Sequence, residues 1–263
     1  MERIKRTSEM TADTVKFRAS QIGNIMSGTG KGWSVEKSLT CKRELIKIYR
    51  QLIYQRSKSA ITKYTEKGIQ AEDDAITLFS RVKKSFYKKN TERLTDDYFS
   101  GEFDLSNNKE TVDIKSSWSL DTFPHPSVNE IDSGYEYQGQ VYMHLTGKKK
   151  HTIAYCLVNT PLFLLVKEKE RLYYNMGCPD EGSKHFNRYM NEIRAIEQNM
   201  IFDFDQFRRD NPNYDLECSK EIIDIPLEDR VVTYSVEYDE GIISKVKSRI
   251  DECREWMNQN LFK

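Results

Sequence analysis

A predicted β-hairpin in the middle of the chain constrains the fold more than any other stretch. Its strands are Gly101-Glu102-Phe103-Asp104-Leu105 and Thr111-Val112-Asp113-Ile114-Lys115-Ser116, joined by the polar turn Ser106-Asn107-Asn108-Lys109. Alternate residues of a strand share a face, so Asp113 and Lys115 project together while Ile114 points into the core. Asparagine tolerates the backbone of a tight turn, which folds Asp104 back toward Asp113. Two carboxylates and one ammonium are therefore expected in one small volume.

Two interpretations of this cluster are open. The first is a surface hairpin with an ordinary cross-strand ion pair, which would contribute a few tenths of a kcal/mol to stability. The second is a Mg²⁺ site for phosphodiester cleavage, because Mg²⁺ prefers carboxylate and carbonyl oxygens. In that case Asp104, Asp113 and the Ile114 carbonyl would hold the metal. Lys115 would position or deprotonate the attacking water and steady the developing charge.

A third carboxylate is expected on a preceding helix. The segment from Gly68 to about Val82 carries an apolar stripe of Ile69, Ile76 and Phe79. At roughly 100° per residue, Glu72 falls inside that stripe, whereas the next two acids fall at its edge or on the opposite face. A buried carboxylate without a partner is costly, so a metal would explain Glu72. The alternative is a slightly rotated helix with all three acids in water.

These residues occur in an order that resembles a known superfamily. Glu72 on a helix, Gly101-x-x-Asp104, Asp113-x-Lys115 and Gln138 on a later helix together resemble the PD-(D/E)XK nucleases. More narrowly, the pattern is similar to the lambda exonuclease and YqaJ-type viral recombinase family. Gly68-x-x-x-Glu72-x-x-Ala75, Arg18-Ala19-Ser20 and the Gln138-x-Gln140 helix ending in Thr146-Gly147 carry this closer likeness, which covers roughly residues 16–160.

The resemblance implies a set of site residues. Glu72, Asp104, Asp113 and Ile114 would bind one or two Mg²⁺ ions, for which Mn²⁺ can substitute, and Lys115 and Gln138 would complete the catalytic site. The DNA-contacting residues implied by the resemblance are Ser20, Ser116, Ser117, Trp118 and Gln140. Asp113 stands where the family more often has Glu. The arginine that precedes the serine segment in the phage enzyme has no clear match here.

The resemblance also implies a function. It favours a 5′-to-3′ exonuclease that processes double-stranded DNA ends for phage-type recombination, in the cytoplasm of a bacterial host. A ring-shaped homotrimer and a single-strand annealing protein as partner follow from the family alone. The alternatives are a PD-(D/E)XK endonuclease, a CRISPR-associated RecB-like nuclease and, from a different class, a non-catalytic DNA-binding module.

Composition agrees with a DNA-binding protein of a reducing compartment. The net charge is zero, but residues 1–90 hold 20 Lys and Arg against 9 Asp and Glu, which indicates a basic face. The alternative is two oppositely charged faces that pack together. The five cysteines form no Cys-x-x-Cys motif, which argues against zinc, an iron–sulfur cluster or a disulfide framework. The sequence contains no long apolar run, so neither a transmembrane helix nor a secretory signal is expected.

The periodicity of apolar residues predicts an α/β fold with a mixed central sheet, a catalytic hairpin flanked by helices and a helical C-terminal extension. We expect one nuclease domain over residues 1–263, with a core at about 16–175 and the extension at about 176–263. Helices are predicted at 17–27, 36–56, 68–82, 133–145, 183–200 and 240–261. Strands are predicted at 85–88, 150–158, 162–167 and 171–175, and residues 201–235 are expected to be irregular.

Overall fold

The computed structural model describes residues 11–28, 33–56, 61–128, 131–218 and 222–262. The α-helices of these residues are α1 (Ile22–Ile25), α2 (Leu39–Tyr54), α3 (Lys63–Gln70), α4 (Glu72–Lys83), α5 (Ser133–Thr146), α6 (Leu162–Asn175), α7 (Phe186–Met200), α8 (Phe204–Asp210) and α9 (Glu240–Asn260). The strands are β1 (Phe17–Arg18), β2 (Lys88–Lys89), β3 (Leu94–Thr95), β4 (Phe99–Gly101), β5 (Leu105–Ser106), β6 (Glu110–Ser116), β7 (Lys150–Cys156) and β8 (Val231–Glu237). The predicted α/β class is confirmed.

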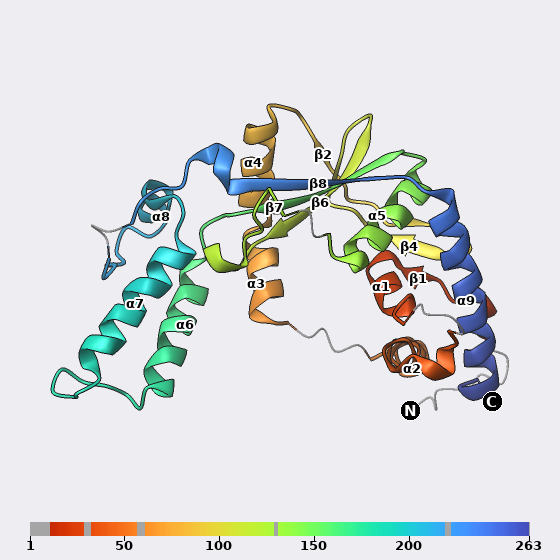
Figure 1. Cartoon of the computed structure of the whole chain (residues 1–263), viewed down its shortest axis with the longest axis horizontal. Coiled ribbons are helices and arrows are strands. Elements are labelled where there is room, and N and C mark those ends of the chain that lie inside the picture. Colours follow the sequence, from red (N-terminus) through yellow and green to blue (C-terminus); the bar gives the residue numbers. More distant parts are fainter. Residues whose placement is uncertain (1–10, 29–32, 57–60, 129–130, 219–221, 263) are drawn as a thin grey trace, which may run out of the picture.

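A mixed five-stranded sheet forms the centre, in the order β2-β5-β6-β7-β8. The predicted hairpin is present as the antiparallel pair β5 and β6, with Leu105 opposite Val112. Its first strand is shorter than predicted, because Gly101 belongs to β4 of a second sheet and residues 102–104 lie in no strand. Strand β7 runs parallel to β6, with Asp113 opposite Ile153, and α5 lies in the crossover between them. Figure 1 shows α6, α7 and α8 at one end of the molecule and α1, α2 and α9 at the other, with this sheet between them.

The two faces of β6 have different neighbours because its side chains alternate. Val112 and Ile114 pack with α4 in one apolar cluster that includes Ala75, Leu78 and Phe79. The opposite face lies under α5, where Thr111 bonds His151 of β7, at 2.8 Å between Oγ1 and Nδ1. Asp113 and Lys115 belong to this second face. The alternation of β6 therefore directs its charged residues toward α5, as the sequence predicts.

A smaller sheet, ordered β1-β4-β3, holds the N-terminal segment against the body. Residues 17–27 were expected to form one helix, but only Ile22–Ile25 are α-helical. Phe17 instead pairs with Phe99 of β4, and a 3-10 turn at Ala19–Gln21 leads into the short α1. Pairing with a distant strand outweighs the local helical pattern here.

Helix α2 begins later than predicted because residues Val35–Lys37 form a 3-10 turn and the Ser38 side chain caps Cys41 N–H at 3.2 Å. Two leucines of this helix, Leu39 and Leu52, are exposed. The residues that α2 buries are Cys41, Glu44, Leu45 and Ile48. Gln21 and Asn24 donate hydrogen bonds to the buried Glu44 carboxylate, at 2.8 and 3.1 Å. This pairing explains how a charged residue occupies a buried position.

The segment between β7 and α9 departs most from the predictions. Residues 162–175, expected to form two short strands, form the single helix α6, which buries Leu164 and Leu165. Outside this segment, the strand predicted at 85–88 begins only at Lys88, as β2. Residues 201–235, expected to be irregular, contain α8 and most of β8. Strand β8 pairs antiparallel with all of β7, so the C-terminal segment completes the central sheet.

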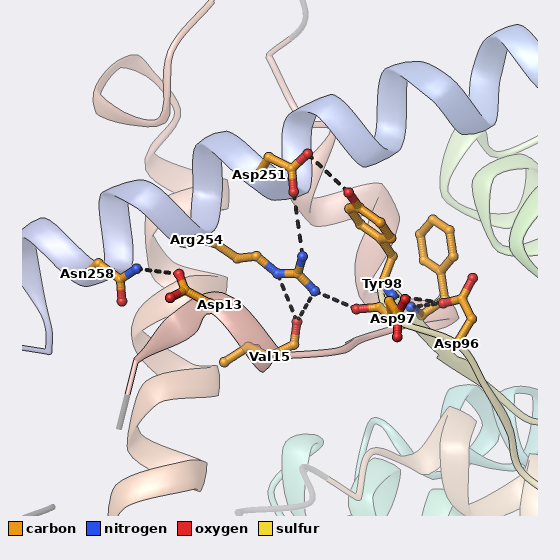
Figure 2. Close-up of polar contacts among 9 residues, drawn as sticks. Asp13, Val15, Asp96, Asp97, Tyr98, Asp251, Arg254 and Asn258 are labelled. Atoms are coloured by element: carbon orange, nitrogen blue, oxygen red, sulfur yellow. Dashed lines mark hydrogen bonds and ion pairs between the residues drawn. The ribbon is translucent and has the colours of Figure 1, made fainter. Parts of the chain in front are cut away.

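The predicted C-terminal helix is α9, which packs onto the body. Its fully buried residues are Ile243, Val246, Ile250, Cys253 and Met257. Figure 2 shows how Arg254 of α9 ties two distant segments together. Its guanidinium donates to the Val15 carbonyl from Nε at 3.2 Å and from an NH group at 2.9 Å, and to the Asp97 carbonyl at 2.6 Å. Within the described residues no helix is long and apolar enough to span a bilayer.

Candidate active site

The hairpin brings Asp104, Asp113 and Lys115 together at one end of β6. Asp104 lies just before β5, and its Oδ2 accepts a hydrogen bond from the Ile114 amide at 2.6 Å. Asp113 is buried, with its side chain 5% exposed, and it forms an ion pair with Lys115. Lys115 Nζ also lies 4.5 Å from the centre of the Tyr135 ring on α5. The predicted convergence of two carboxylates and one ammonium is therefore present.

The electrostatics of this cluster are unusual for a surface hairpin. Burial, together with the neighbouring Asp113 and Glu72 carboxylates, raises the pKa of Asp104 to about 7. Burial disfavours the charged form of Lys115, but Asp113 outweighs burial, so the pKa of Lys115 lies above its ordinary value. Lys115 is thus a charged ammonium at neutral pH, and Asp104 is a carboxyl that loses its proton readily only above neutrality.

The Ile114 carbonyl is directed toward the same place. In a strand, the N–H and C=O of one residue point to the same neighbouring strand. The Ile114 N–H points to the β5 side, where it bonds Asp104 instead of a strand, because the β5 ladder ends at Leu105 opposite Val112. The carbonyl of Ile114 therefore faces the Asp104 side, beyond the end of the ladder.

Glu72 is less buried than predicted. The chain breaks at Ala71, where φ is −103° and ψ is 12°, so the predicted single helix is two helices and Glu72 is the first residue of α4. Its side chain is 39% exposed and pairs with Lys89 Nζ at 3.0 Å. Ile69, part of the predicted stripe, is 64% exposed. Glu72 nevertheless lies near enough to Asp104 to raise its pKa, as a third carboxylate of the cluster.

The oxygen atoms of these residues are of the kind that binds a divalent cation. Two carboxylates and a carbonyl at one point are hard oxygen donors, and a cation beside Asp104 would offset the repulsion that raises its pKa. In their present positions the acids pair with Lys115 and Lys89. Among the described residues, no group of three or more His, Cys, Asp or Glu side chains converges as a metal-binding set. Glu72 would have to leave Lys89 to join Asp104 and Asp113.

Helix α5 places Gln138 beside this cluster. Gln138 is buried and donates to the Tyr142 hydroxyl at 2.7 Å, and Tyr142 donates to the Glu102 carbonyl at 2.9 Å. Burial and the charges of Asp113 and Asp104 raise the pKa of Tyr142, so its hydroxyl stays protonated. Gln138 thus bonds a tyrosine that lies within reach of the charges of both carboxylates and is held by the loop before Asp104.

Two glycines allow α5 to approach this closely. A Cβ on Gly139 would lie 2.4 Å from Cδ2 of the buried His151, and a Cβ on Gly101 would lie 3.0 Å from the Tyr142 ring. Burial lowers the pKa of His151 to about 4, so this ring is neutral under the helix. Gly101 is the glycine of the Gly-x-x-Asp motif. Its lack of a side chain makes room for the tyrosine that contacts the site.

The residues expected to contact DNA fall into two groups. Ser20 is exposed in the turn before α1, and Ser116 is half-buried at the end of β6. Ser117 and Trp118 are buried, and Trp118 belongs to an apolar cluster with Leu164, Leu165 and Phe207. Trp118 is therefore part of the core, which does not favour the predicted contact with DNA.

Gln140 is 1% exposed, and the prediction that it contacts DNA is corrected by its surroundings. Its amide donates to the Glu237 carbonyl at 2.7 Å and accepts from the Asp239 amide at 2.9 Å. Both ends of the side chain are therefore used to hold the turn between β8 and α9. The second Gln of the Gln-x-Gln pattern is a structural residue in this chain.

Sequence reasoning did not single out four residues near the cluster. Tyr135 lies against Lys115, and His151 lies within reach of the Asp113 charge. Lys89 and Arg93 pair with Glu72 and Glu102. The position of Tyr135, three residues before Gln138 on the same helix face, was a usable indication. The other three come from separate elements, and only the fold brings them to the site.

The elements that bear Glu72, Asp104, Asp113, Lys115 and Gln138 are thus a helix, the hairpin region and the crossover helix, in the order that resembles the PD-(D/E)XK nucleases. No family model and no curated protein matches this sequence.

Solved structures agree with this architecture. The chain is similar to a phage-related exonuclease from Haemophilus somnus 129PT, with a TM-score of 0.66, 22% identity, and coverage of 94% of this chain and 95% of the other. It is also similar to the alkaline exonuclease LHK-Exo from Laribacter hongkongensis, with a TM-score of 0.56, 11% identity and 94% coverage of both chains. The structure of LHK-Exo in complex with dAMP gives a TM-score of 0.54 at 11% identity, covering 96% of this chain and 93% of the other. The chain thus has the fold of phage-type exonucleases, and the resemblance predicted from the sequence is confirmed.

Proposed function

We propose that the chain is a metal-dependent deoxyribonuclease that degrades double-stranded DNA from its ends. The observation that carries this proposal is the cluster of Asp104, Asp113 and charged Lys115 at the end of β6, in the fold of phage-type exonucleases. An ordinary surface ion pair does not explain why the half-buried Asp104 lies beside the buried Asp113 in surroundings that raise the pKa of Asp104 to about 7.

Each residue has a proposed role. Asp104, Asp113 and the Ile114 carbonyl would hold one or two Mg²⁺ ions, or Mn²⁺ in their place, and Glu72 would join them on leaving Lys89. The bound ion would polarise the scissile phosphate and lower the pKa of a coordinated water. Because the pKa of Lys115 is raised, this ammonium is suited to position the water and stabilise negative charge, and it would serve as a base only after losing its proton. Gln138, held by Tyr142, would orient the water.

A basic cavity supports duplex ends as the substrate. It has a volume of about 440 Å³ and is lined by Lys16, Arg18 and Arg93, with Thr95 and Ser100. Arg93 of this cavity pairs with Glu102 at 2.8 Å, and Glu102 lies two residues before Asp104 in the chain. We propose that Ser20 and Ser116 contact the DNA backbone near this cavity. A terminal 5′-phosphate bound there would give 5′-to-3′ polarity.

The biological setting is also a proposal. By resemblance, the enzyme would act in phage-type recombination in the cytoplasm of a bacterial host, as a homotrimer, together with a single-strand annealing protein. Gel filtration with light scattering would test the trimer independently of activity, since a trimer has three times the mass of the 31.0 kDa chain.

The experiment incubates the protein, with Mg²⁺ or with EDTA, with linear duplexes ending in 5′-phosphate or 5′-hydroxyl and with a covalently closed circle. Mg²⁺-dependent loss of the 5′-phosphorylated duplex, with the label at the 5′ end released first, supports the proposal. Asp104→Asn and Lys115→Ala should each lower the rate by at least roughly 100-fold. Lys109→Ala, at an exposed position of the hairpin turn, is the matched control and should keep the wild-type rate.

The rival functions give different results. Cutting of the closed circle would identify an endonuclease. DNA binding without cleavage of any substrate, in wild-type protein with Mg²⁺ or Mn²⁺, would identify a non-catalytic module. A wild-type rate in both the Asp104 and Lys115 variants would show that the cluster is not the active site.

A further inference from the structure

A second cavity, of about 250 Å³, lies between α4, the start of α8 and the 3-10 turn Leu227–Arg230. Its lining includes Thr77 and Arg81 of α4, Gln206 and Arg209 of α8, and Arg230. No residue of the candidate active site lines it. Thr77 and Arg81 lie on a different face of α4 from Glu72, since they follow it by five and nine residues at roughly 100° each. The cavity is therefore separate from the proposed chemistry.

Arg230 is the unusual residue of this cavity. It is 7% exposed, and a guanidinium has five N–H donors. Among the described residues one acceptor is bonded to it, Asp203 Oδ2, at 3.3 Å from NH1. Its Nε is buried without a partner among these residues. A buried donor without a partner is costly, and a ligand with several acceptor oxygens would remove that cost.

Two further guanidiniums line the same cavity from separate elements. Arg81 and Arg209 are exposed and form no ion pair within the part of the chain that the structure describes. Two carboxylates, Asp74 and Asp203, also line it, so the lining carries one more positive charge than negative. The Asp203 carboxylate is already engaged, because it accepts from the Gln206 amide at 2.9 Å as well as from Arg230.

The backbone of the cavity is fixed by Asn159, which follows β7. Its Oδ1 accepts from the amides of Phe202 and Asp203, at 2.7 and 2.9 Å, and its Nδ2 donates to the Asp203 carbonyl at 2.7 Å. The segment that enters α8 is thereby held against the sheet. The side chains of Arg209 and Arg230 therefore extend from a backbone that is held in place, as an anion site requires.

We propose that this cavity binds a small anion that carries a phosphate group. Guanidinium groups bind phosphate oxygens in pairs, and three of them from different directions match a tetrahedral anion better than a flat carboxylate. The volume lies just below the range of drug-sized pockets, which suits inorganic phosphate or the phosphate of a mononucleotide. Asp74 would accept a hydroxyl of an attached sugar. The site is independent of the proposed nuclease activity.

The test measures binding by titration calorimetry, in phosphate-free buffer with EDTA, of inorganic phosphate, dAMP and deoxyadenosine. Wild-type protein should bind phosphate or dAMP but not deoxyadenosine. Tighter binding of dAMP than of inorganic phosphate would identify a mononucleotide as the ligand, and equal binding would identify phosphate alone. Arg81→Ala and Arg209→Ala should each weaken binding by at least about tenfold, because a charge-assisted contact is lost.

Arg208→Ala is the matched control, since Arg208 is exposed on the same helix and does not line the cavity. It should bind the anion as the wild type does. The two cavity variants change exposed side chains, so loss of binding with an unchanged unfolding transition and normal nuclease activity would support a separate anion site. No binding by the wild-type protein, equal binding of deoxyadenosine, or wild-type affinity in the Arg81→Ala, Arg209→Ala double variant would overturn the proposal.

Discussion

The buried charges of this protein are accommodated in two ways. Asp113 and Glu197 each have a lysine partner, so burial does not isolate them. Lys67 of α3 is fully buried and forms no ion pair among the described residues. Its ammonium donates to the Trp118 carbonyl at 3.0 Å and lies 5.3 Å from the centre of the Phe202 ring. Burial lowers the pKa of Lys67 to about 7, so this lysine changes charge near neutral pH.

Lys67→Met should remove a pH-dependent part of the stability. In the unfolded chain the amine has a pKa near 10.4, so between about pH 7 and pH 10 the unfolded state binds one more proton than the folded state. Stability of the wild type therefore rises with pH over this window, by roughly 2–3 kcal/mol from pH 7 to pH 9 through Lys67. Below pH 7 Lys67 is protonated in both the folded and the unfolded state, so the full free-energy cost of burying its charge lowers the stability.

Urea unfolding at pH 6.5, 8 and 9 measures this effect. The free energy of unfolding of Lys67→Met should exceed that of wild type most at pH 6.5. This difference should fall as the pH rises. Lys245→Met, on the exposed face of α9, should follow the wild-type pH dependence. A stability difference between Lys67→Met and wild type that stays constant with pH would mean that Lys67 does not titrate in this window.

At the scale of elements, the contact between α5 and β7 fixes the geometry of the candidate site. Gly139→Ala would place a methyl group 2.4 Å from the His151 ring, which is buried and bonded to Thr111. The helix would have to move outward and take Gln138 and Tyr142 with it. We expect a loss of stability of about 1–3 kcal/mol, typical of overpacking, and a lower nuclease rate. Thermal unfolding and the cleavage assay measure both effects.

The control for this substitution is Gly68→Ala in α3. None of the residues that the structure describes comes within 4 Å of a Cβ at Gly68, so alanine there should stabilise the helix by about 0.5–1 kcal/mol. A Gly139→Ala protein as stable and active as wild type would show that α5 can shift without disturbing the site.

The elements that could be predicted from the sequence are those with a complete local pattern. The hairpin, α5, β7 and α9 have a clear period and clear ends, so Asp104, Asp113 and Lys115 could be placed together. Residues 162–167 form a short apolar run, for which periodicity alone does not distinguish a strand from a buried helix. Strand β8 does alternate, with Val232, Tyr234 and Val236 buried, but it lies within an acidic stretch that obscured the pattern.

The site residues that could not be placed depend on distant partners. The break at Ala71, which sets the exposure of Glu72, has no glycine or proline to indicate it. Gln140 is buried by the turn after β8, nearly a hundred residues away. Trp118 is enclosed by helices α6 and α8, and one of these was predicted as strands. Local periodicity carries no information about such contacts.

Arg254 of α9 joins elements that are far apart in the sequence, and its loss should loosen them together (Figure 2). Arg254→Ala leaves the Val15 and Asp97 carbonyls without this donor, and we expect the free energy of unfolding to fall by about 1.5–3 kcal/mol. Arg254→Lys should recover only part of this stability, because an ammonium does not reproduce the planar fork of the guanidinium. Urea unfolding measures both. Lys245→Ala, on the exposed face of the same helix, is expected to stay within about 0.5 kcal/mol of wild type. An equally small effect of Arg254→Ala would show that Arg254 does not stabilise the contact of α9 with these two segments.

At the scale of the whole molecule, the open question is whether the chain unfolds as the single domain predicted from its sequence. One apolar cluster joins α2, α5 and α9 at one end, and another joins α6, α8 and Trp118 at the other. The sheet lies between the two clusters, and β8 enters it from the C-terminal segment. Tryptophans report on both ends, because Trp33 and Trp256 pack against the first cluster and Trp118 belongs to the second.

Ile250→Ala, in the first cluster, tests this cooperativity in a Trp33→Phe, Trp256→Phe background, where Trp118 is the remaining fluorophore. Ile250 is fully buried, so its truncation should cost about 2–5 kcal/mol. In a single domain, Trp118 fluorescence and far-UV circular dichroism would move to the same lower urea midpoint, although Trp118 lies in the other cluster. Ile223→Ala, at a residue 85% exposed, should leave the midpoint unchanged. If the fluorescence midpoint stays at the value of the parent protein while the circular dichroism shifts, the α6–α8 end unfolds as a unit of its own.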